Sequence, residues 1–291
     1  MHTIQRKRNW VKEEVIMKKR LFALLTVAAV ALTAIGCGSN GGSTASSAAS
    51  SAAGSSAAST TAAGKKYIIA TDTAFAPFEY QETDGKYVGI DMDILEAVAK
   101  DQGFEYEINA LGFDASLQAV QGGQADGVIA GMSITDKRKE VFDFSESYYN
   151  VPVTIAVKAD SKIEKLDDLK DQKVAVKKGT TGATVAEEIK DKVGIKEIVV
   201  FDDSATMYQE VAVGTSVACF EDYPVMAYAI KVNPELTSKI KVVESVAEKE
   251  TPYGFAVKKG ANAELLDKFN KGLANIKKNG VFDEIIKKYT K

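Results

Sequence analysis

Histidine and cysteine, which many catalytic and transition-metal sites use, are scarce after position 36. The one histidine, His2, lies before that position, and so does the one tryptophan, Trp10. Without histidine, the rest of the chain cannot assemble a Ser-His-Asp or Cys-His catalytic set, or a zinc or iron site that uses histidine. Its two cysteines, Cys37 and Cys219, are too few for a disulfide scaffold and make a poor metal site.

The basic residues are strongly biased in type. Of the 30 basic residues after position 36, 29 are lysine and one is arginine, Arg138. A guanidinium is a planar fork that donates two parallel hydrogen bonds to a carboxylate, which an ammonium cannot do. On residue type alone, a solvated surface side chain at the start of a helix is the simpler interpretation of Arg138.

The composition is that of an ordinary globular protein. The 291 residues are 45% hydrophobic and 26% charged, with 37 basic and 40 acidic residues and a net charge of −3. After position 36 the counts are 30 and 38, for a net charge of −8. No basic domain or stripe is present, so nucleic-acid binding is excluded.

Residues 17–37 have the layout of a secretory targeting segment. Three basic residues follow Met17, an apolar run covers 21–35, and Gly36 precedes Cys37. The apolar run is shorter than the roughly 20 residues that a membrane-spanning helix needs. Residues 33–37 resemble a bacterial lipobox, which implies cleavage before Cys37 and lipid on its thiol. An ordinary signal peptide or a short membrane anchor is the alternative.

The segments around this signal carry little folding information. Residues 1–36 comprise an N-terminal extension and the signal. The codons of residues 12–14 could contain a ribosome-binding sequence, so translation could start at Met17 instead of Met1. Residues 37–64 are almost entirely serine, alanine, glycine and threonine. Because such a stretch lacks large apolar side chains, we expect it to be a flexible tether.

From residue 65 onward, short apolar runs alternate with helical patterns. We predict strands over 67–71, 105–109, 127–130, 153–157, 173–176, 197–201, 217–220, 240–243 and 254–257. We predict helices over 91–101, 115–121, 184–191, 204–213, 224–232, 261–279 and 281–289. Asp91 is predicted to cap its helix. Strands separated by helices favour βαβ units and parallel sheets.

Two extended polar segments, near 148–154 and 248–253, suggest how the body is divided. If they run side by side, they form the crossings of a hinge between two lobes. Lobe 1 would then combine 65–148 with 253–291, and lobe 2 would be the inserted 149–252. Periodicity alone does not establish this division.

Five stretches of the body resemble, in order, the signatures of one family. They are ATDTAFAPFEY at 70–80, GIDMD at 89–93, AGMSITDKR at 130–138, DFSESYY at 143–149 and VKKGTTG at 176–182. The family is that of polar amino-acid-binding proteins of ABC importers, extracellular solute-binding proteins of family 3, with the glutamine-binding branch nearest in motif. The resemblance implies an α/β fold of two lobes, each a mainly parallel sheet flanked by helices, joined by two crossing strands and closing on the ligand.

The resemblance also assigns roles at the ligand's α-carbon. Arg138 falls on the position that binds the carboxylate, with Ser133 and the backbone N–H of Thr181 beside it. The Gly131 carbonyl and Asp222 would accept hydrogen bonds from the ammonium. The other interpretation of Asp222 is a helix N-cap, which is common for Asp before a proline.

Side-chain recognition is assigned to four further residues. Phe75 and Phe113 would sandwich the aliphatic part of the ligand, although core packing is the usual role of a phenylalanine. Asp72 offers an acceptor and Lys177 a donor, which together match a side-chain amide and favour glutamine. Lys177 disfavours a cationic ligand, whereas the neighbouring Glu221 adds a negative group and leaves the choice less certain.

Two other functions are compatible with this fold. An enzyme such as a dehydratase acting on a cyclic acid would need a general acid or base in the cleft, and an amino-acid-sensing module would need a signalling domain. The acceptors for an ammonium favour a binding protein. The resemblance implies no cofactor and no metal. It implies a monomer that is lipid-anchored at the outer face of the cytoplasmic membrane. The expected partners are a free amino acid and the membrane subunits of an ABC permease.

Overall fold

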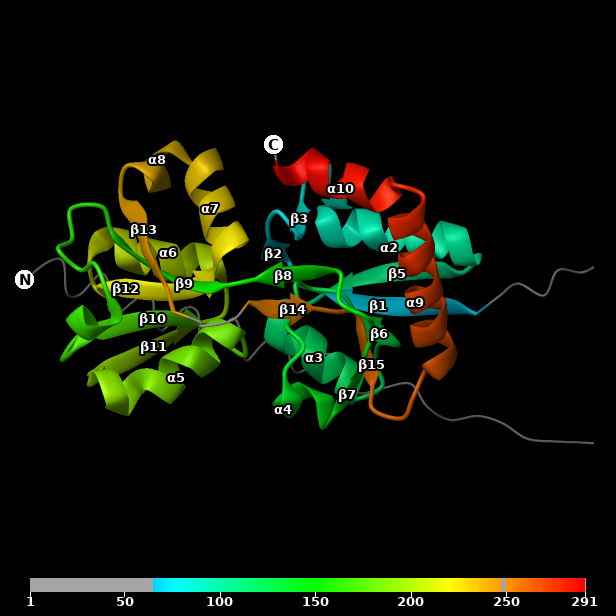
Figure 1. Ribbon diagram of the computed structural model, residues 1–291, viewed down its shortest axis with the longest axis horizontal. Helices are drawn as coiled ribbons and strands as arrows, with labels where there is room; N and C mark the ends of the chain where they lie inside the picture. Colours follow the sequence, from blue (N-terminus) through cyan, green and yellow to red (C-terminus); the bar gives the residue numbers. More distant parts are fainter. Residues whose placement is uncertain (1–64, 247–249, 291) are drawn as a thin grey trace, which may run out of the picture. The chain divides into compact units, whose positions relative to one another are not determined.

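The computed structural model describes residues 65–246 and 250–290. The predicted signal segment, the lipidation site Cys37 and the tether lie outside these residues. Among the helices of the described part, none combines the length and the apolar character needed to cross a membrane. Two sheets, each flanked by helices, make up the body (Figure 1).

The first sheet, which we call lobe 1 together with its helices, has the strand order β5-β1-β6-β15-β7. The bounds of its strands are β1 Lys66–Thr71, β5 Glu105–Ala110, β6 Gly127–Val128, β7 Phe142–Phe144 and β15 Ala256–Lys258. One face packs against three helices, α2 Ile90–Gln102, α9 Ala263–Lys278 and α10 Val281–Thr290. The other face is covered by α3 Phe113–Gln121, whose Leu117 and Val120 lie in the core.

The second sheet, lobe 2, has the order β11-β10-β12-β9-β13. Its strands are β9 Val153–Lys158, β10 Lys173–Lys177, β11 Glu197–Phe201, β12 Ala218–Asp222 and β13 Ile240–Ser245. The helix α5 Thr181–Val193 covers one face, with Ala186 in the core, and α6 Ser204–Val213 and α7 Tyr223–Val232 cover the other. Two short turns of helix, η1 Leu166–Leu169 and α8 Pro234–Thr237, lie in the connections.

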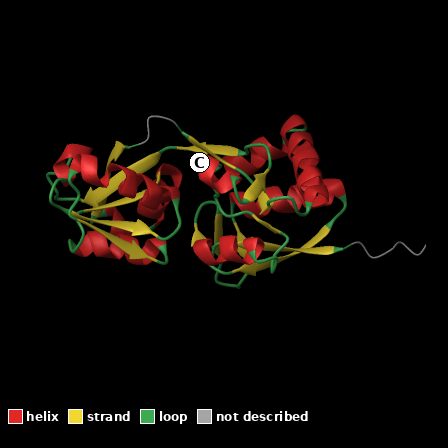
Figure 2. Cartoon of the chain, turned by 90° about the horizontal axis from the view of Figure 1, so that it is seen from below, coloured by secondary structure: helices red, strands yellow, loops and turns green. Residues whose placement is uncertain are grey.

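Two strands connect the lobes. β8 Tyr149–Val151 and β14 Thr251–Tyr253 pair in antiparallel fashion, with Asn150 opposite Pro252. Both run between the two sheets (Figure 1), and Figure 2 gives the same arrangement from below. These are the segments in which the hinge crossings are expected.

Two small structures in lobe 1 position the site, and the strand and helix ranges predicted from the sequence include neither. A three-stranded sheet forms between β1 and α2 from β2 Ala74–Phe75, β3 Glu79–Gln81 and β4 Tyr87–Val88. The short helix α4 Asp136–Lys139 follows β6. Strands of two or three residues are too short for a period-2 pattern to be read.

The predicted two-lobed α/β architecture is confirmed, and two details differ. Each sheet is mixed, because β15 runs antiparallel to β6 and β7, and β9 runs antiparallel to β12 and β13. β9 follows directly from the β8 crossing and β15 comes soon after the β14 crossing, so each enters its sheet against the neighbouring strands. The capping role predicted for Asp91 is wrong: the N-cap is Gly89, and no side chain caps α2.

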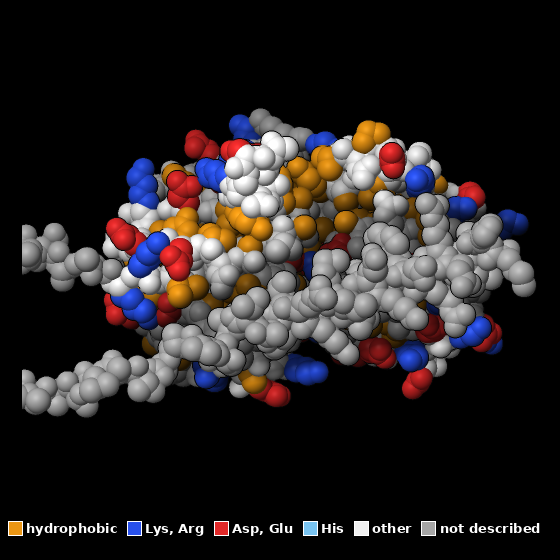
Figure 3. Space-filling view, turned by 180° about the vertical axis from the view of Figure 1, so that it is seen from behind, with side chains coloured by type: hydrophobic (Ala, Val, Ile, Leu, Met, Phe, Trp, Pro, Cys, Tyr) orange, Lys and Arg blue, Asp and Glu red, His pale blue; other side chains and the backbone are white. Residues whose placement is uncertain are grey.

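Charge is dispersed over the surface. On the face shown in Figure 3, acidic and basic side chains intermingle, and the described part of that face has no large patch of a single sign.

Candidate functional site

A small cavity lies between the lobes, with about 220 Å³ of empty volume. Its lining residues come from both sheets: Phe75, Phe113, Gly131, Ser133, Arg138, Lys177, Thr180, Thr181 and Asp222. Eight of the nine ligand-binding residues predicted from sequence are in this set. Asp72 is the exception, and Thr180 is an addition.

Arg138 extends from α4 toward lobe 2. Thr135 caps α4 by accepting a hydrogen bond from the Arg138 N–H at 3.3 Å. The guanidinium donates to the Ser133 carbonyl at 2.7 Å and to the Gly179 carbonyl of lobe 2 at 3.0 Å. It also lies 5.2 Å from the centre of the Phe113 ring. Burial lowers its pKa to about 10, so the group remains a cation at neutral pH.

Asp222 ends β12 and occupies the N-cap position of α7, but its side chain makes no capping hydrogen bond. Its carboxylate instead accepts a hydrogen bond from the hydroxyl of Tyr253, which ends the β14 crossing. Both residues are almost fully buried. Burial, reinforced by the nearby charge of Glu221, raises the pKa of Asp222 to about 7. Asp222 therefore stands at the N-cap position without capping the helix through its side chain.

Asp72 and Lys177 form an ion pair that connects the lobes. Asp72 follows β1 and Lys177 ends β10, and the two side chains are 2% and 1% exposed. The Lys177 ammonium also lies 4.9 Å from the centre of the Phe75 ring. Asp72 does not line the cavity itself, but it pairs with Lys177, which does. Removing one partner of such a buried ion pair is costly, because the other charge is then left buried and unpaired.

Glu221 faces away from the cavity lining. Its carboxylate accepts hydrogen bonds from Ser204 Oγ at 2.8 Å, from the Tyr208 hydroxyl at 3.0 Å and from the Asp222 N–H at 3.0 Å. Burial raises its pKa, whereas the Lys177 charge and these donors lower it. The sequence left open whether Glu221 adds a negative charge to the cavity wall. The carboxylate is instead held by donors of lobe 2, and Glu221 is not among the lining residues.

The N-terminus of α5 closes the cavity on the lobe 2 side. Thr180 caps this helix, its hydroxyl accepting a hydrogen bond from the Ala183 N–H at 3.2 Å. The Thr181 hydroxyl is buried and has no hydrogen-bond partner. A helix N-terminus favours an anionic group through its free N–H groups and its dipole. A carboxylate held by Arg138 from one side could be held by this end of α5 from the other.

Sequence reasoning missed two participants, Thr180 and Tyr253. The signal for Thr180 was present, since a Gly-Thr-Thr-Gly turn before a helix places a capping threonine first. Tyr253 carried no signal, because its partner Asp222 comes from a different lobe, 31 positions away. Among the described residues, no cluster of three histidine, cysteine, aspartate or glutamate side chains could hold a metal ion.

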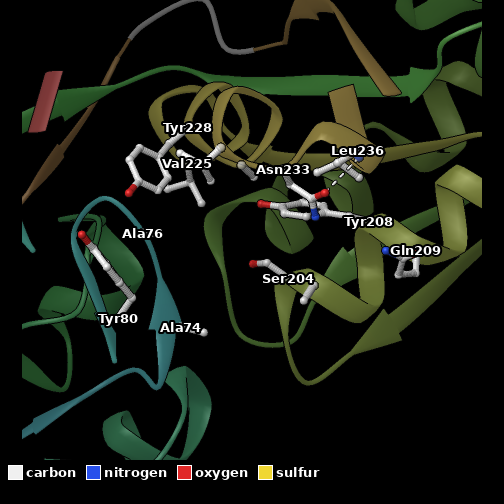
Figure 4. A pocket seen from close by; sticks show the side chains of 13 residues that line it. Ala74, Ala76, Tyr80, Ser204, Tyr208, Gln209, Val225, Tyr228, Asn233 and Leu236 are labelled. Carbon is white, nitrogen blue, oxygen red and sulfur yellow. Dashed lines mark hydrogen bonds between the residues drawn. The ribbon is translucent and has the colours of Figure 1, made fainter. Parts of the chain in front are cut away.

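A second pocket between the lobes lies on the other side of β2, with about 710 Å³ of empty volume (Figure 4). Ala74, Ala76 and Tyr80 approach it from lobe 1, and Ser204, Tyr208 and Tyr228 are among those lining it from lobe 2. The rings of Tyr80 and Tyr228 lie 6.2 Å apart across it. Its lining is largely apolar and tyrosine-rich, which contrasts with the charged wall of the smaller cavity.

Comparison with known proteins gives a family match over most of the body. The family model "Bacterial extracellular solute-binding proteins, family 3" matches residues 67–291. The arginine-binding extracellular protein ArtP of Bacillus subtilis is 33% identical over 277 residues, covering 94% of this chain and 98% of ArtP. The ABC transporter glutamine-binding protein GlnH of Bacillus subtilis is 30% identical over 284 residues, covering 94% and 98%. The structure of an ancestral arginine-binding protein bound to arginine superposes with a TM-score of 0.73 at 36% identity, covering 79% of this chain and all of that one.

Proposed function

Because the chain belongs to the bacterial extracellular solute-binding proteins of family 3, we propose that it binds a free amino acid between its lobes and delivers it to an ABC importer. The relatives named for arginine and glutamine support an amino acid as the class of ligand. Because they are named as binding proteins, they also support a role without catalysis.

The observation that carries the proposal is the pairing of opposite charges across one small cavity. Arg138 from lobe 1 presents a cation and Asp222 from lobe 2 presents a carboxylate, and both line the same space. A free amino acid carries the complementary carboxylate and ammonium on one carbon. Binding it would tie the two lobes together, because a ligand shifts a hinge only if it contacts the closed form better than the open one.

We assign the remaining contacts by the chemistry of each wall. The guanidinium, Ser133 and the start of α5 at Thr181 would hold the carboxylate. Asp222 and the Gly131 carbonyl would hold the ammonium, and Phe75 and Phe113 would enclose the aliphatic carbons. All seven of these residues line the cavity.

Glutamine is the ligand that we propose for this cavity. Its side-chain amide has both a donor and an acceptor, which match Asp72 and Lys177 at the point where the two already pair with each other. Arginine would bring a second cation against Lys177, and like charges in a buried site disfavour binding. Because some relatives are named for arginine, the choice between glutamine and arginine is the point that an experiment must decide.

The test is isothermal calorimetry on protein that has been unfolded and refolded to remove any ligand carried through purification. All twenty amino acids are compared at the same concentration. Tight binding of glutamine with at least tenfold weaker binding of arginine and histidine supports the full assignment. Preference for arginine would keep the transport function and refute the roles given to Asp72 and Lys177. No binding to any of the twenty would overturn the amino-acid assignment.

We further propose that Cys37 anchors the protein by lipid to the outer face of the cytoplasmic membrane. The support is the lipobox-like sequence at 33–37 and the serine- and alanine-rich segment that follows it. Labelled palmitate should enter the wild-type protein in a bacterial host and should not enter Cys37→Ser. Equal labelling of both proteins would contradict lipidation at this residue.

A further inference from the structure

Two carboxyl groups that no proposed contact uses are buried together beneath the cavity. Glu79 begins β3 and Asp91 is the second residue of α2, and both side chains are fully buried at 0% exposure. The backbone holds the two elements together, because the Asp91 N–H donates to the Phe78 carbonyl at 2.9 Å. β3 lies beside the start of α2 in the fold (Figure 1).

The hydrogen bonds of this pair are unevenly distributed. Asp91 Oδ2 accepts from the Gly131 N–H at 2.7 Å and from the Tyr148 hydroxyl at 2.9 Å. Asp91 Oδ1 and both carboxyl oxygens of Glu79 have no donor from any other residue. The two carboxyl groups are near enough for each to shift the pKa of the other. Ionised carboxylates only accept, so this contact becomes a hydrogen bond only when one of them carries a proton.

The surrounding charges indicate which group holds that proton. Burial raises the pKa of Glu79 well above its usual value, and the negative charges of Asp91 and Asp72 add to this, while Lys177 opposes it. Burial raises the pKa of Asp91 only to about 6, because the Gly131 and Tyr148 donors favour its charged form. A neutral Glu79 beside an ionised Asp91 satisfies one more buried oxygen than two carboxylates would.

Asp91 is connected to the cavity through the Gly131 turn. Gly131 has a φ of +52°, and a Cβ added there would lie 2.6 Å from the Phe75 ring. The turn is therefore fixed between Asp91, which holds its N–H, and the aromatic wall of the cavity. A shift of this turn would move the carbonyl that we assign to the ligand's ammonium.

We propose that Glu79 and Asp91 share one proton and act as a positioning pair, with protonated Glu79 keeping Asp91 ionised and hydrogen-bonded to the Gly131 turn. This inference deepens the proposed function and rests on it where ligand affinity is concerned. The proton itself, and its effect on Gly131, do not depend on which ligand binds.

The first test is a pH titration by NMR of protein labelled with ¹³C at the glutamate carboxyl carbons. The resonance that disappears in Glu79→Gln should have the chemical shift of a protonated carboxyl at neutral pH. The matched control is Glu82→Gln, at an exposed residue of the same loop region, which should leave the Glu79 resonance where it is in the wild type. A Glu79 resonance that is fully ionised at pH 7 would overturn the proposal.

The second test reads the position of Gly131. The Gly131 amide resonance should stay in place in Glu79→Gln, because the amide donates as the protonated carboxyl does, and should move in Asp91→Asn. Glutamine affinity should stay within threefold in Glu79→Gln and fall more than tenfold in Asp91→Asn. If the wild type binds no amino acid, the proposed function fails while the NMR results still decide the pair. An unmoved Gly131 resonance in a folded Asp91→Asn would refute the positioning role.

The third measurement does not need Asp91→Asn to fold. A carboxyl whose pKa is raised by folding makes the native state less stable as pH rises above its unfolded value of about 4.3. Glu79→Gln lacks that proton, so its thermal midpoint should rise relative to wild type between about pH 5 and pH 8. A difference that stays constant over that range would contradict proton retention by Glu79.

Discussion

At the scale of single residues, the site depends on geometry that a conservative substitution can test. Arg138 donates from one nitrogen to Ser133 and from another to Gly179 of the opposite lobe, so its fork is used on both sides of the cavity. We expect Arg138→Lys to weaken amino-acid binding by more than tenfold, about 1.4 kcal/mol, because an ammonium cannot make the paired contact.

Calorimetry with the ligand identified for the wild type measures this loss. Lys137→Arg is the matched control, since it changes the same chemistry at an exposed neighbour and should leave affinity unchanged. Equal affinity of Arg138→Lys and wild type would remove Arg138 from the binding contacts.

A second prediction at this scale concerns pH. Asp222 has a pKa of about 7, raised first by burial. Below that pH the carboxyl takes up a proton and no longer attracts an ammonium, so affinity should fall by up to about tenfold per pH unit on acidification. Above pH 7 the carboxylate is ionised and the dependence should level off.

Titration calorimetry between about pH 5 and pH 8 would show this slope. Asp222→Asn should bind more weakly at neutral pH and lose most of the slope, which separates this group from Asp91, whose pKa is about 6. A wild-type affinity that does not change across the range would contradict the role of Asp222.

At the scale of elements, the packing of α5 against β12 sets the position of the cavity wall. Gly182, in the first turn of α5, has no room for a side chain: a Cβ would lie 2.7 Å from the Phe220 carbonyl oxygen of β12. We expect Gly182→Ala to destabilise the protein by about 1–3 kcal/mol, because backbone on both sides must move. The unfolding midpoint should drop by about 2–4 °C for each kcal/mol.

Thermal unfolding would measure this change, with Glu187→Ala, at an exposed position of the same helix, as the control. Because α5 carries Thr180 and Thr181, ligand affinity should fall as well. Full stability in Gly182→Ala would show that the helix can shift without cost.

The elements also show what sequence reasoning could predict. β11 and α6 have the predicted bounds, since each combines a clear apolar period with flanking turn or cap residues. β2 to β4 were missed because they are too short for a pattern. Asp91 looked like a cap from its place before an apolar helix, yet Gly89 holds that position and the first N–H groups of α2 donate to carbonyls at 77 and 78.

For the site, the resemblance to the family brought eight of the nine cavity residues to attention, and six of the eight lie within the quoted motifs. The partners of those residues could not be predicted. Tyr253 is 120 or more positions from the Gly131 turn it packs beside, and the pairing of Glu79 with Asp91 depends on how a three-residue strand lies against a helix. Such contacts are set by tertiary packing and leave no periodic trace in the chain.

At the scale of the whole molecule, the lobes are joined by hydrogen bonds and ion pairs as well as by the hinge strands. The buried pair of Asp72 and Lys177 is one such link, and Lys178 with Asp114 at 2.8 Å is a more exposed one. In Asp72→Asn the Lys177 ammonium loses its buried partner, which in a rigid core would cost about 3–5 kcal/mol.

A hinged molecule can relieve that cost by separating its lobes and hydrating the ammonium. We therefore expect Asp72→Asn to increase the radius of gyration in small-angle X-ray scattering without ligand, with little loss in thermal midpoint. The double variant Asp72→Asn/Lys177→Met should return the radius toward the wild-type value. A compact Asp72→Asn with a much lower midpoint would show that the lobes do not separate.

The two crossing strands have a consequence for the order in which the chain can fold. The lobe 2 sheet is built from consecutive residues and has all its strands once β13 ends at Ser245, whereas the lobe 1 sheet lacks an inner strand until β15 is complete at Lys258. A chain that emerges from its N-terminus therefore carries the first part of lobe 1 unfinished while lobe 2 assembles. During that interval the edge of β6 lacks its β15 partner, and a truncation before Ala256 should leave lobe 2 folded and lobe 1 not.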